Sequence, residues 1–407
     1  MKQLLKSILF LLLVTSCTEP YALQSEDFEE ALVVEATLTN EFKKQEISIS
    51  KTYPLENIQT SIEKNAIVFV KDDLGTTYNF IETDNKYISE NEFQALPNRT
   101  YQLFIKTANG NSYVSNNQTL TKNNTIDDVT TTVRTINGQK GVEIGVNHKD
   151  PDNASKFYRY TYEETSKVTA PKWVDSELKL QITAPYYDII YALIYFELRT
   201  EEARVCYKTT KSKEIILKET TKQSQDIVEK FPLKFINYKN YDIAERYSIL
   251  VNLYTQNLES YTYYKNLKKS AENGNILSPS QPGFIRGNIT CVNDNNKKVL
   301  GYFEVSSVSS KRIFFNYFDV FVDENNLPDY FNPCNIVELE PYDYEGFRED
   351  GDEKEAITLR TKIKNKSLIY YDKYFKSNGT ITFMLVEPPC GDCRVIGSNV
   401  RPSFWID

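Results

Sequence analysis

The chain has 407 residues, of which 26% are charged and 40% hydrophobic, and its formal net charge is −8. This length exceeds one ordinary hydrophobic core and predicts two or three domains of a globular protein. The acidic balance argues against nucleic-acid binding, which needs clustered Lys and Arg. With only 1 His in the sequence, a histidine-rich metal site is excluded as well.

The first residues have the pattern of a lipoprotein signal peptide. Two Lys residues precede the apolar segment Ile8–Val14, and small residues then lead to Cys17. This order is typical of secretion signals, and Cys17 is at the position that bacterial lipoprotein processing acylates. We therefore expect residues 1–16 to be removed, Cys17 to carry lipid such as palmitate, and residues 17–27 to form a tether. The alternatives are an ordinary secretory cleavage or an uncleaved anchor, for which the apolar segment is too short.

The aromatic content predicts a chain built mainly of strands. There are 29 Tyr and 22 Phe, and these residues favour half-buried strands. Short apolar runs alternate with turn signals such as Asp72-Asp73-Leu74-Gly75. We expect immunoglobulin-like β-sandwich domains, the first over residues 28–124 and a second mainly β region over residues 125–407. An aromatic surface that stacks on sugars or packs against a partner is the alternative interpretation of the Tyr and Phe excess.

The second region contains further elements with clear signals. Asn137-Gly138 lies between two strand-like runs and favours a type I′ hairpin turn. Residues 258–271 have the apolar periodicity of a helix, which we expect to pack on a sheet. Residues 319–355 form an acidic, loop-like region. Within it, the carboxylates of the stretch Asp343 to Glu355 could hold Ca²⁺, but they lack the spacing of a dedicated loop, so we expect a solvated segment.

Residues 189–196 are eight consecutive apolar residues. A buried strand explains such a run, and contact with a partner or with a membrane surface is the alternative. If the run is exposed, it is the candidate interface of this chain. The residues of this candidate interface are Ile189, Ile190, Tyr191, Leu193, Ile194, Tyr195 and Phe196.

Export beyond the inner membrane would place the cysteines where thiols tend to pair. Five cysteines follow Cys17, so at most two disulfides form and one thiol is left. These candidates are Cys206, Cys291, Cys334, Cys390 and Cys393. Cys390 and Cys393 have the spacing of a redox pair or of half a zinc site, yet they follow a strand and do not begin a helix. We therefore expect structural disulfides that fix the tail, with Cys334 as a plausible partner for one of them.

Catalytic signals are weak. His148 is the only histidine, so any Ser-His-Asp or Cys-His arrangement must use it. It precedes the Asp150-Pro151 turn, where we expect an exposed loop histidine. No phosphate-binding glycine-rich loop or Gly-x-Ser-x-Gly elbow occurs, and no pair of carboxylates is singled out for glycoside hydrolysis. We predict a non-enzymatic protein with no catalytic residues, no metal and no cofactor.

Several segments together resemble a known family. They are Arg246–Val251, the helix around Tyr261 to Lys268, Gln281–Ile289, Val299–Phe303, Cys390–Arg394 and Pro402–Trp405. These segments are similar to those of the domain of unknown function 4249 family, a lipoprotein family of the Bacteroidota. The resemblance covers nearly all of the chain after the signal peptide. Cys291 and the acidic segment after Asp319 depart from the family pattern.

The resemblance implies a location and a kind of partner. Such proteins are typically encoded near outer-membrane TonB-dependent receptors and are thought to sit at the cell surface, and the family has no established catalytic residues. We therefore expect a lipid-anchored outer-membrane protein, on the cell-surface side, that is a non-enzymatic accessory subunit of an outer-membrane β-barrel protein. A TonB-dependent transporter is the favoured partner, in ligand capture or uptake. The alternatives are a structural subunit of an assembly or export machine and a lipid-tethered hydrolase.

Overall fold

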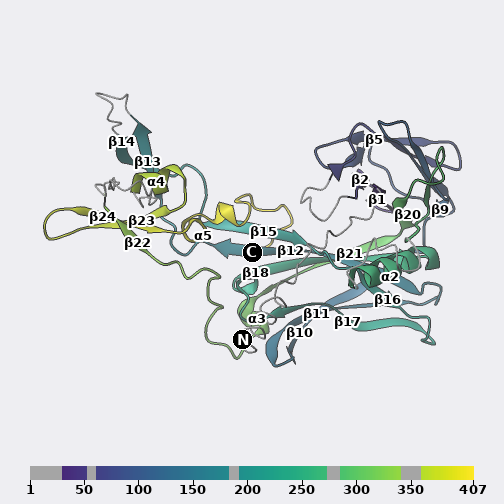
Figure 1. Ribbon diagram of the computed structural model, residues 1–407. Coiled ribbons are helices and arrows are strands. Elements are labelled where there is room, and N and C mark those ends of the chain that lie inside the picture. The colour runs from purple at the N-terminus through teal and green to yellow at the C-terminus, as the bar shows by residue number, and fades with distance from the viewer. Residues whose placement is uncertain (1–29, 53–60, 183–191, 273–284, 341–358) are drawn as a thin grey trace, which may run out of the picture.

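The computed structural model describes residues 30–52, 61–182, 192–272, 285–340 and 359–407. The fold is mainly β, as the composition predicts, with 50% strand and 10% helix. The strands form a nearly closed, barrel-like sheet, a body of two sheets and a smaller lobe that extends from this body (Figure 1). Within the described ranges, no helix is both long enough and apolar enough to cross a membrane.

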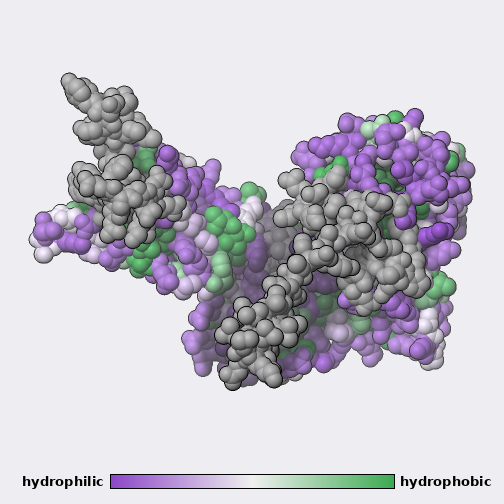
Figure 2. All heavy atoms as spheres, viewed as in Figure 1, coloured by the Kyte–Doolittle hydropathy of each residue, from purple (hydrophilic) through white to green (hydrophobic). Residues whose placement is uncertain are grey.

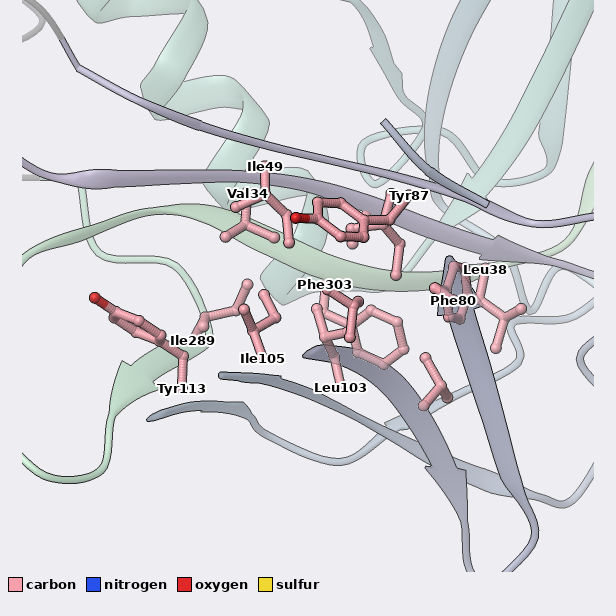
Figure 3. Close-up of a cluster of buried hydrophobic side chains, with 14 of the residues drawn as sticks. Val34, Leu38, Ile49, Phe80, Tyr87, Leu103, Ile105, Tyr113, Ile289 and Phe303 are labelled. Atoms are coloured by element: carbon pink, nitrogen blue, oxygen red, sulfur yellow. The ribbon is translucent and has the colours of Figure 1, made fainter. Parts of the chain in front are cut away.

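The barrel-like sheet contains eleven strands, nine of which follow one another in the order β19-β8-β7-β4-β5-β6-β2-β1-β20. Their inward side chains meet in a single core that includes Val34, Leu103 and Phe303 (Figure 3). Alternate residues of each pleated strand point to opposite faces, which explains the alternating burial along β7. The strands are β1 (Leu32–Thr39), β2 (Glu46–Lys51), β3 (Ser61–Ile62), β4 (Ile67–Asp72), β5 (Thr77–Glu82), β6 (Tyr87–Ser89), β7 (Thr100–Lys106), β8 (Ser112–Ser115), β9 (Gln118–Thr119), β19 (Ile289–Cys291) and β20 (Val299–Ser306).

The barrel-like sheet differs from the expected immunoglobulin-like sandwich over residues 28–124, which is not seen. Residues 289–306, expected in the second region, return to this sheet, and β20 pairs with β1 in parallel. Gly301 permits this close approach, because a Cβ there would lie 2.2 Å from the Val34 carbonyl oxygen. Apolar periodicity identifies strands but not their distant partners, which is why the sequence did not reveal this arrangement.

The two-sheet body has a core shared by its two facing sheets, to which Ile144, Tyr160 and Tyr247 contribute. The predicted hairpin is confirmed: β10 pairs with β11, and Asn137 and Gly138 have positive φ values of 49° and 76°. One sheet consists of β10 (Ile126–Ile136), β11 (Gln139–Asp150) and β17 (Asp226–Asn237). The other consists of β12 (Phe157–Thr169), β15 (Val205–Lys211), β16 (Ile216–Glu219), β18 (Arg246–Gln256) and β21 (Val308–Asn316).

The predicted helix is confirmed as α2 (Leu258–Glu272). It contacts both β12 and β20, so it packs where the two-sheet body meets the barrel-like sheet (Figure 1). Short helical turns complete these regions: η1 (Tyr241–Ile243), α3 (Tyr317–Val320), α5 (Pro388–Gly391) and η2 (Cys393–Val395). The first part of the expected acidic loop region, through residue 340, is described and includes part of α3. Residues 341–358 lie outside the described residues, and with them the whole stretch Asp343 to Glu355 considered for Ca²⁺.

Candidate functional site

A smaller lobe extends from the body at the side away from the barrel-like sheet (Figure 1), and we name it the distal lobe. Its core combines Leu178 and Leu359 with Phe383 and Leu385. The core is small, so several large side chains of the lobe stay at its surface. The elements of the distal lobe are β13 (Ser176–Ile182), β14 (Ala192–Leu198), β22 (Val337–Leu339), α4 (Leu359–Lys364), β23 (Ile369–Phe375) and β24 (Ile381–Val386).

The apolar run expected as a buried strand or an interface falls on the β13–β14 hairpin of this lobe. Ile194 packs against the lobe core. Tyr195 and Phe196 are 39% and 40% exposed, and Leu198, beyond the end of the run, is 69% exposed. Leu193 pairs through its backbone with Gln181. Ile189, Ile190 and Tyr191 lie outside the described residues.

Exposed apolar side chains continue onto β23. The Phe196 ring lies 5.0 Å from the Tyr370 ring and 4.1 Å from the Lys373 ammonium group. Phe375, near the tip of the β23–β24 hairpin, is 68% exposed. Figure 2 shows hydrophobic residues on the lobe and at its connection to the body, within a surface that is mostly hydrophilic. The lobe therefore offers apolar contact area on two of its strands.

Two disulfides lie where the lobe joins the body, and we name this connection the neck. Cys206 of β15 is bonded to Cys393, and Cys334 is bonded to Cys390. Cys291 is a free, buried thiol in the barrel-like sheet. The structure thus has the two disulfides and the spare thiol that five cysteines allow. Cys390 and Cys393 do not bond to each other, because the short α5 turn directs them to different partners.

Charged groups surround this neck. The Asp392 carboxylate accepts hydrogen bonds from the Arg394 backbone and side chain, with its Oδ2 atom 2.7 Å from the guanidinium. Burial alone would raise the pKa of Asp392, but the hydrogen bonds and charge of Arg394 hold it below its ordinary value. The guanidinium of Arg199 lies 3.5 Å from the same carboxylate. Asp392 is therefore a fixed anion that anchors the tail beside the disulfides.

A different arrangement joins the barrel-like sheet to the two-sheet body. Arg159 of β12 and Glu304 of β20 form an ion pair of 2.7 Å in which both side chains are almost fully buried. The guanidinium lies between the rings of Tyr254 and Tyr264, at 4.3 and 4.6 Å from their centroids. Cations are attracted to the faces of such rings. The pair therefore crosses the boundary between the two regions in a dry environment.

Hydrogen bonds complete this joint. Gln256 and Ser260 each donate to the Glu304 carboxylate at 2.7 Å. Burial opposes the charged form of Glu304, but Arg159 and these donors hold its pKa below the ordinary value. The sequence alone does not reveal this pair. A charged residue within the otherwise apolar run Val299–Val305 was the available signal, because a buried carboxylate requires a partner.

The prediction of an exposed loop histidine at position 148 is wrong. His148 lies within β11 and is 1% exposed, with its Nε2 atom 2.6 Å from the Tyr160 hydroxyl. Burial lowers its pKa to about 4, so the ring is neutral at pH 7. The long hairpin carries β11 through position 148 to Asp150, whose carboxylate accepts backbone hydrogen bonds from Asp152 and Ser155 in the turn. The turn starts two residues later than the histidine, which explains the error.

Within the described ranges, no group of three or more His, Cys, Asp and Glu side chains has the arrangement of a metal site. The open depressions of the surface have charged and apolar linings, as at the one lined by Lys167, Arg246, Leu327 and Asp407.

Comparisons with known proteins agree with the resemblance noted in the sequence over residues 18–312, whereas the segments Cys390–Arg394 and Pro402–Trp405 lie outside the matched residues. No curated protein and no solved structure matches the chain. One family description matches residues 18–312, which end within β21 and leave out β22, β23 and β24 of the distal lobe and three of the four disulfide-bonded cysteines. Because the match covers well over half of the chain, this protein belongs to the family described as Domain of unknown function (DUF4249).

Proposed function

We propose that this protein is a lipid-anchored, non-enzymatic accessory subunit of an outer-membrane complex, and that the distal lobe contacts its partner. The exposed apolar side chains of β14 and β23 carry this proposal. Apolar groups that gather on one part of a surface are typical of contact sites. A TonB-dependent transporter is the favoured partner, for which the protein would capture or cover a ligand at the cell surface.

The edges of the hairpin also suit a protein partner. β13 and β14 form a two-stranded sheet, so within the described residues each strand has one edge without a backbone partner. Such an edge can add a strand from another chain, with side chains such as Leu198 giving apolar contact. The same feature favours the second candidate, a structural subunit of an assembly or export machine, because that role also requires protein contact.

The neck supports an exported location. All four bonded cysteines are buried, with Cys206, Cys390 and Cys393 at 0% exposure. Structural disulfides form and persist in oxidising compartments. Together with the lipoprotein pattern that ends at Cys17, this supports our proposal that the protein acts beyond the inner membrane, with the lipid as its anchor.

The anchor is tested by Cys17→Ala. Several acyl chains make membrane attachment effectively stable, so we expect this substitution to release the protein from the membrane fraction or to block its processing. Cys291→Ala is the matched control, because Cys291 is a free thiol in the folded part of the chain. Unchanged maturation and membrane association of Cys17→Ala would contradict lipidation.

The contact site is tested by co-purification in mild detergent through a tag at the C-terminus, where Ile406 is 60% exposed. We expect an outer-membrane β-barrel protein to co-purify with the unmodified chain and to be lost with Leu198→Asp. Leu74→Asp is the control, because Leu74 is 76% exposed and lies in the turn after β4 of the barrel-like sheet, outside the lobe. Equal loss with both variants, or retention of the partner with Leu198→Asp, would contradict a contact through β14.

A further inference from the structure

Most strand edges of the two-sheet body are covered or protected against pairing with another chain. The edge of β15 is covered by the C-terminal segment, where Tyr207 and Ser398 exchange two backbone hydrogen bonds of 2.8 and 3.0 Å. β10 packs against β21, and the Ser309 hydroxyl accepts a hydrogen bond from the Ile126 backbone. The edge of β17 includes register shifts and Pro232, which has no N–H group to donate. Bulges and prolines of this kind keep an edge from adding a strand.

The distal lobe has an edge without such protection. Its strand β22 has only 3 residues, and β23 is interrupted by a register shift between Tyr370 and Asp372. β13 carries the ion pair of Lys179 and Glu177, at 2.7 Å, and contacts α4 and β23. β14 is 7 residues long, and Glu197 is its single charged residue. Among the described strands of the lobe, β14 therefore has the long edge that is open to another chain.

The backbone pattern of the β13–β14 hairpin shows which groups face this open edge. The Arg199 N–H group donates to the Asp175 carbonyl at 2.8 Å, so these two residues form a hydrogen-bonded pair of the antiparallel ladder. Such pairs alternate along a ladder, so every second residue from Arg199 back along β14 also directs its backbone groups to β13. The N–H and C=O groups of the residues between them, Ile194, Phe196 and Leu198, therefore point to the open edge. No backbone partner for these groups occurs within the described part of the chain.

The same three residues place their side chains on one face of the hairpin, which projects from the lobe beyond α4 (Figure 1). Ile194 packs against the lobe core, whereas Phe196 and Leu198 are 40% and 69% exposed. Alternate residues of a strand point to opposite faces, so Tyr195 and Glu197 lie on the other face, where both are exposed. A strand added at this edge therefore meets apolar groups on one face and polar groups on the other.

We infer that the partner contributes an extended segment of its own chain, which pairs with β14 as a third strand of the hairpin. The inference rests on the proposed function, because it names how the partner binds the distal lobe. Strand addition takes its affinity from main-chain hydrogen bonds and its specificity from alternate side chains. The fitting segment has about five residues, with apolar side chains beside Phe196 and Leu198 and polar ones on the opposite face.

Leu198→Pro and Leu198→Val test the backbone pairing in the full chain, by co-purification in mild detergent. Proline removes the N–H group of residue 198, which points away from β13, so the hairpin loses none of its own hydrogen bonds. Valine keeps this N–H group, and both substitutions keep an apolar side chain. We expect Leu198→Pro to reduce the co-purified β-barrel protein at least about tenfold and Leu198→Val to retain it, because a missing donor leaves a buried carbonyl of the partner unpaired.

Hydrogen exchange measures the pairing directly. Amides without a hydrogen-bond partner exchange rapidly, and paired amides exchange slowly. We expect the amides of Phe196 and Leu198 to exchange rapidly in the isolated chain and at least about tenfold more slowly in the purified complex. Unchanged exchange of both amides in the complex would overturn strand addition. This measurement uses the unmodified chain, so it decides the question even if Leu198→Pro unfolds the lobe, which circular dichroism would reveal.

The outcomes separate this inference from the proposed function. Loss of the partner with Leu198→Asp but not with Leu198→Pro keeps the contact site and overturns strand addition. Absence of any co-purified β-barrel protein overturns the proposed function and, with it, this inference. A dimer of the isolated chain that Leu198→Pro dissociates, measured by light scattering, would assign the edge to a second copy of this chain and overturn a partner strand.

Discussion

The two connections of the two-sheet body are built on different chemistry. The barrel-like sheet is joined through the buried Arg159–Glu304 pair, together with α2, whereas the distal lobe is joined through two disulfides at the neck. Among the described residues, the core cluster of the lobe includes 5 buried hydrophobic side chains. Small units with small cores usually need covalent links for stability. This contrast indicates that covalent bonds hold the distal lobe on the body, whereas a buried ion pair and the packing of α2 hold the barrel-like sheet on it.

The largest expected effect is at the non-covalent joint. Arg159→Ala leaves Glu304 as a buried, unpaired charge, which costs about 3–5 kcal/mol of unfolding free energy. Urea denaturation followed by circular dichroism measures this loss. Arg134→Ala removes an ion pair with Glu143 whose arginine is 49% exposed, so it should change stability by about 0–1 kcal/mol. Equal effects of the two variants would show that the buried pair is not what joins the two regions.

Removing the neck disulfide between Cys206 and Cys393 should have a somewhat smaller and more local effect. We expect replacement of both residues by Ser to cost about 2–5 kcal/mol, because the bond closes a chain segment of 187 residues. Limited proteolysis should then release fragments from the lobe, while hydrogen exchange of the barrel-like sheet stays as in the unmodified protein. Cys291→Ala, a change at the free thiol, is the control. Loss of protection in the barrel-like sheet would mean that the neck stabilises the whole molecule.

The sequence predicted local features of this molecule better than its distant contacts. The hairpin turn at Asn137-Gly138 and the helix over residues 258–271 depend on neighbouring residues, and both are confirmed. The pairing of β1 with β20 joins segments more than 260 residues apart, and no local pattern encodes it. The same reason explains the missed Arg159–Glu304 pair, since each of its residues is ordinary until the fold brings them together. The apolar run 189–196 is visible in the sequence, but the exposure of Leu198 depends on the small size of the lobe core.

Acid should weaken the body and leave the neck intact, because disulfides do not titrate. The pKa of His148 is about 4 in the folded chain and 6.5 in the unfolded chain, so protonation favours unfolding. Its contribution is complete above pH 6.5 and is lost as the pH falls through 4, by roughly 3 kcal/mol in total. Denaturation at pH 7 and pH 4.5 should show this loss in the unmodified protein and a smaller one in His148→Gln. An identical pH dependence of the two proteins would assign the effect to the carboxylates.

The smallest effect is expected at a contact between a cation and an aromatic ring in the distal lobe. The same type of contact occurs at Arg159 in the body, which serves as the comparison. Arg159 is itself nearly buried and lies between the partly buried rings of Tyr254 and Tyr264, whereas Lys373 lies over the half-exposed ring of Phe196 in the distal lobe. Water screens an exposed cation, so Lys373→Ala should cost the lobe only about 0.5–1 kcal/mol. Hydrogen exchange of β14 and β23 amides measures this local change, and global unfolding should not move. Lys373→Arg keeps a cation over the ring and should behave as the unmodified chain. If Lys373→Ala lowered global stability as much as Arg159→Ala, the lobe would have to be coupled to the body far more strongly than its small core and its two disulfides indicate.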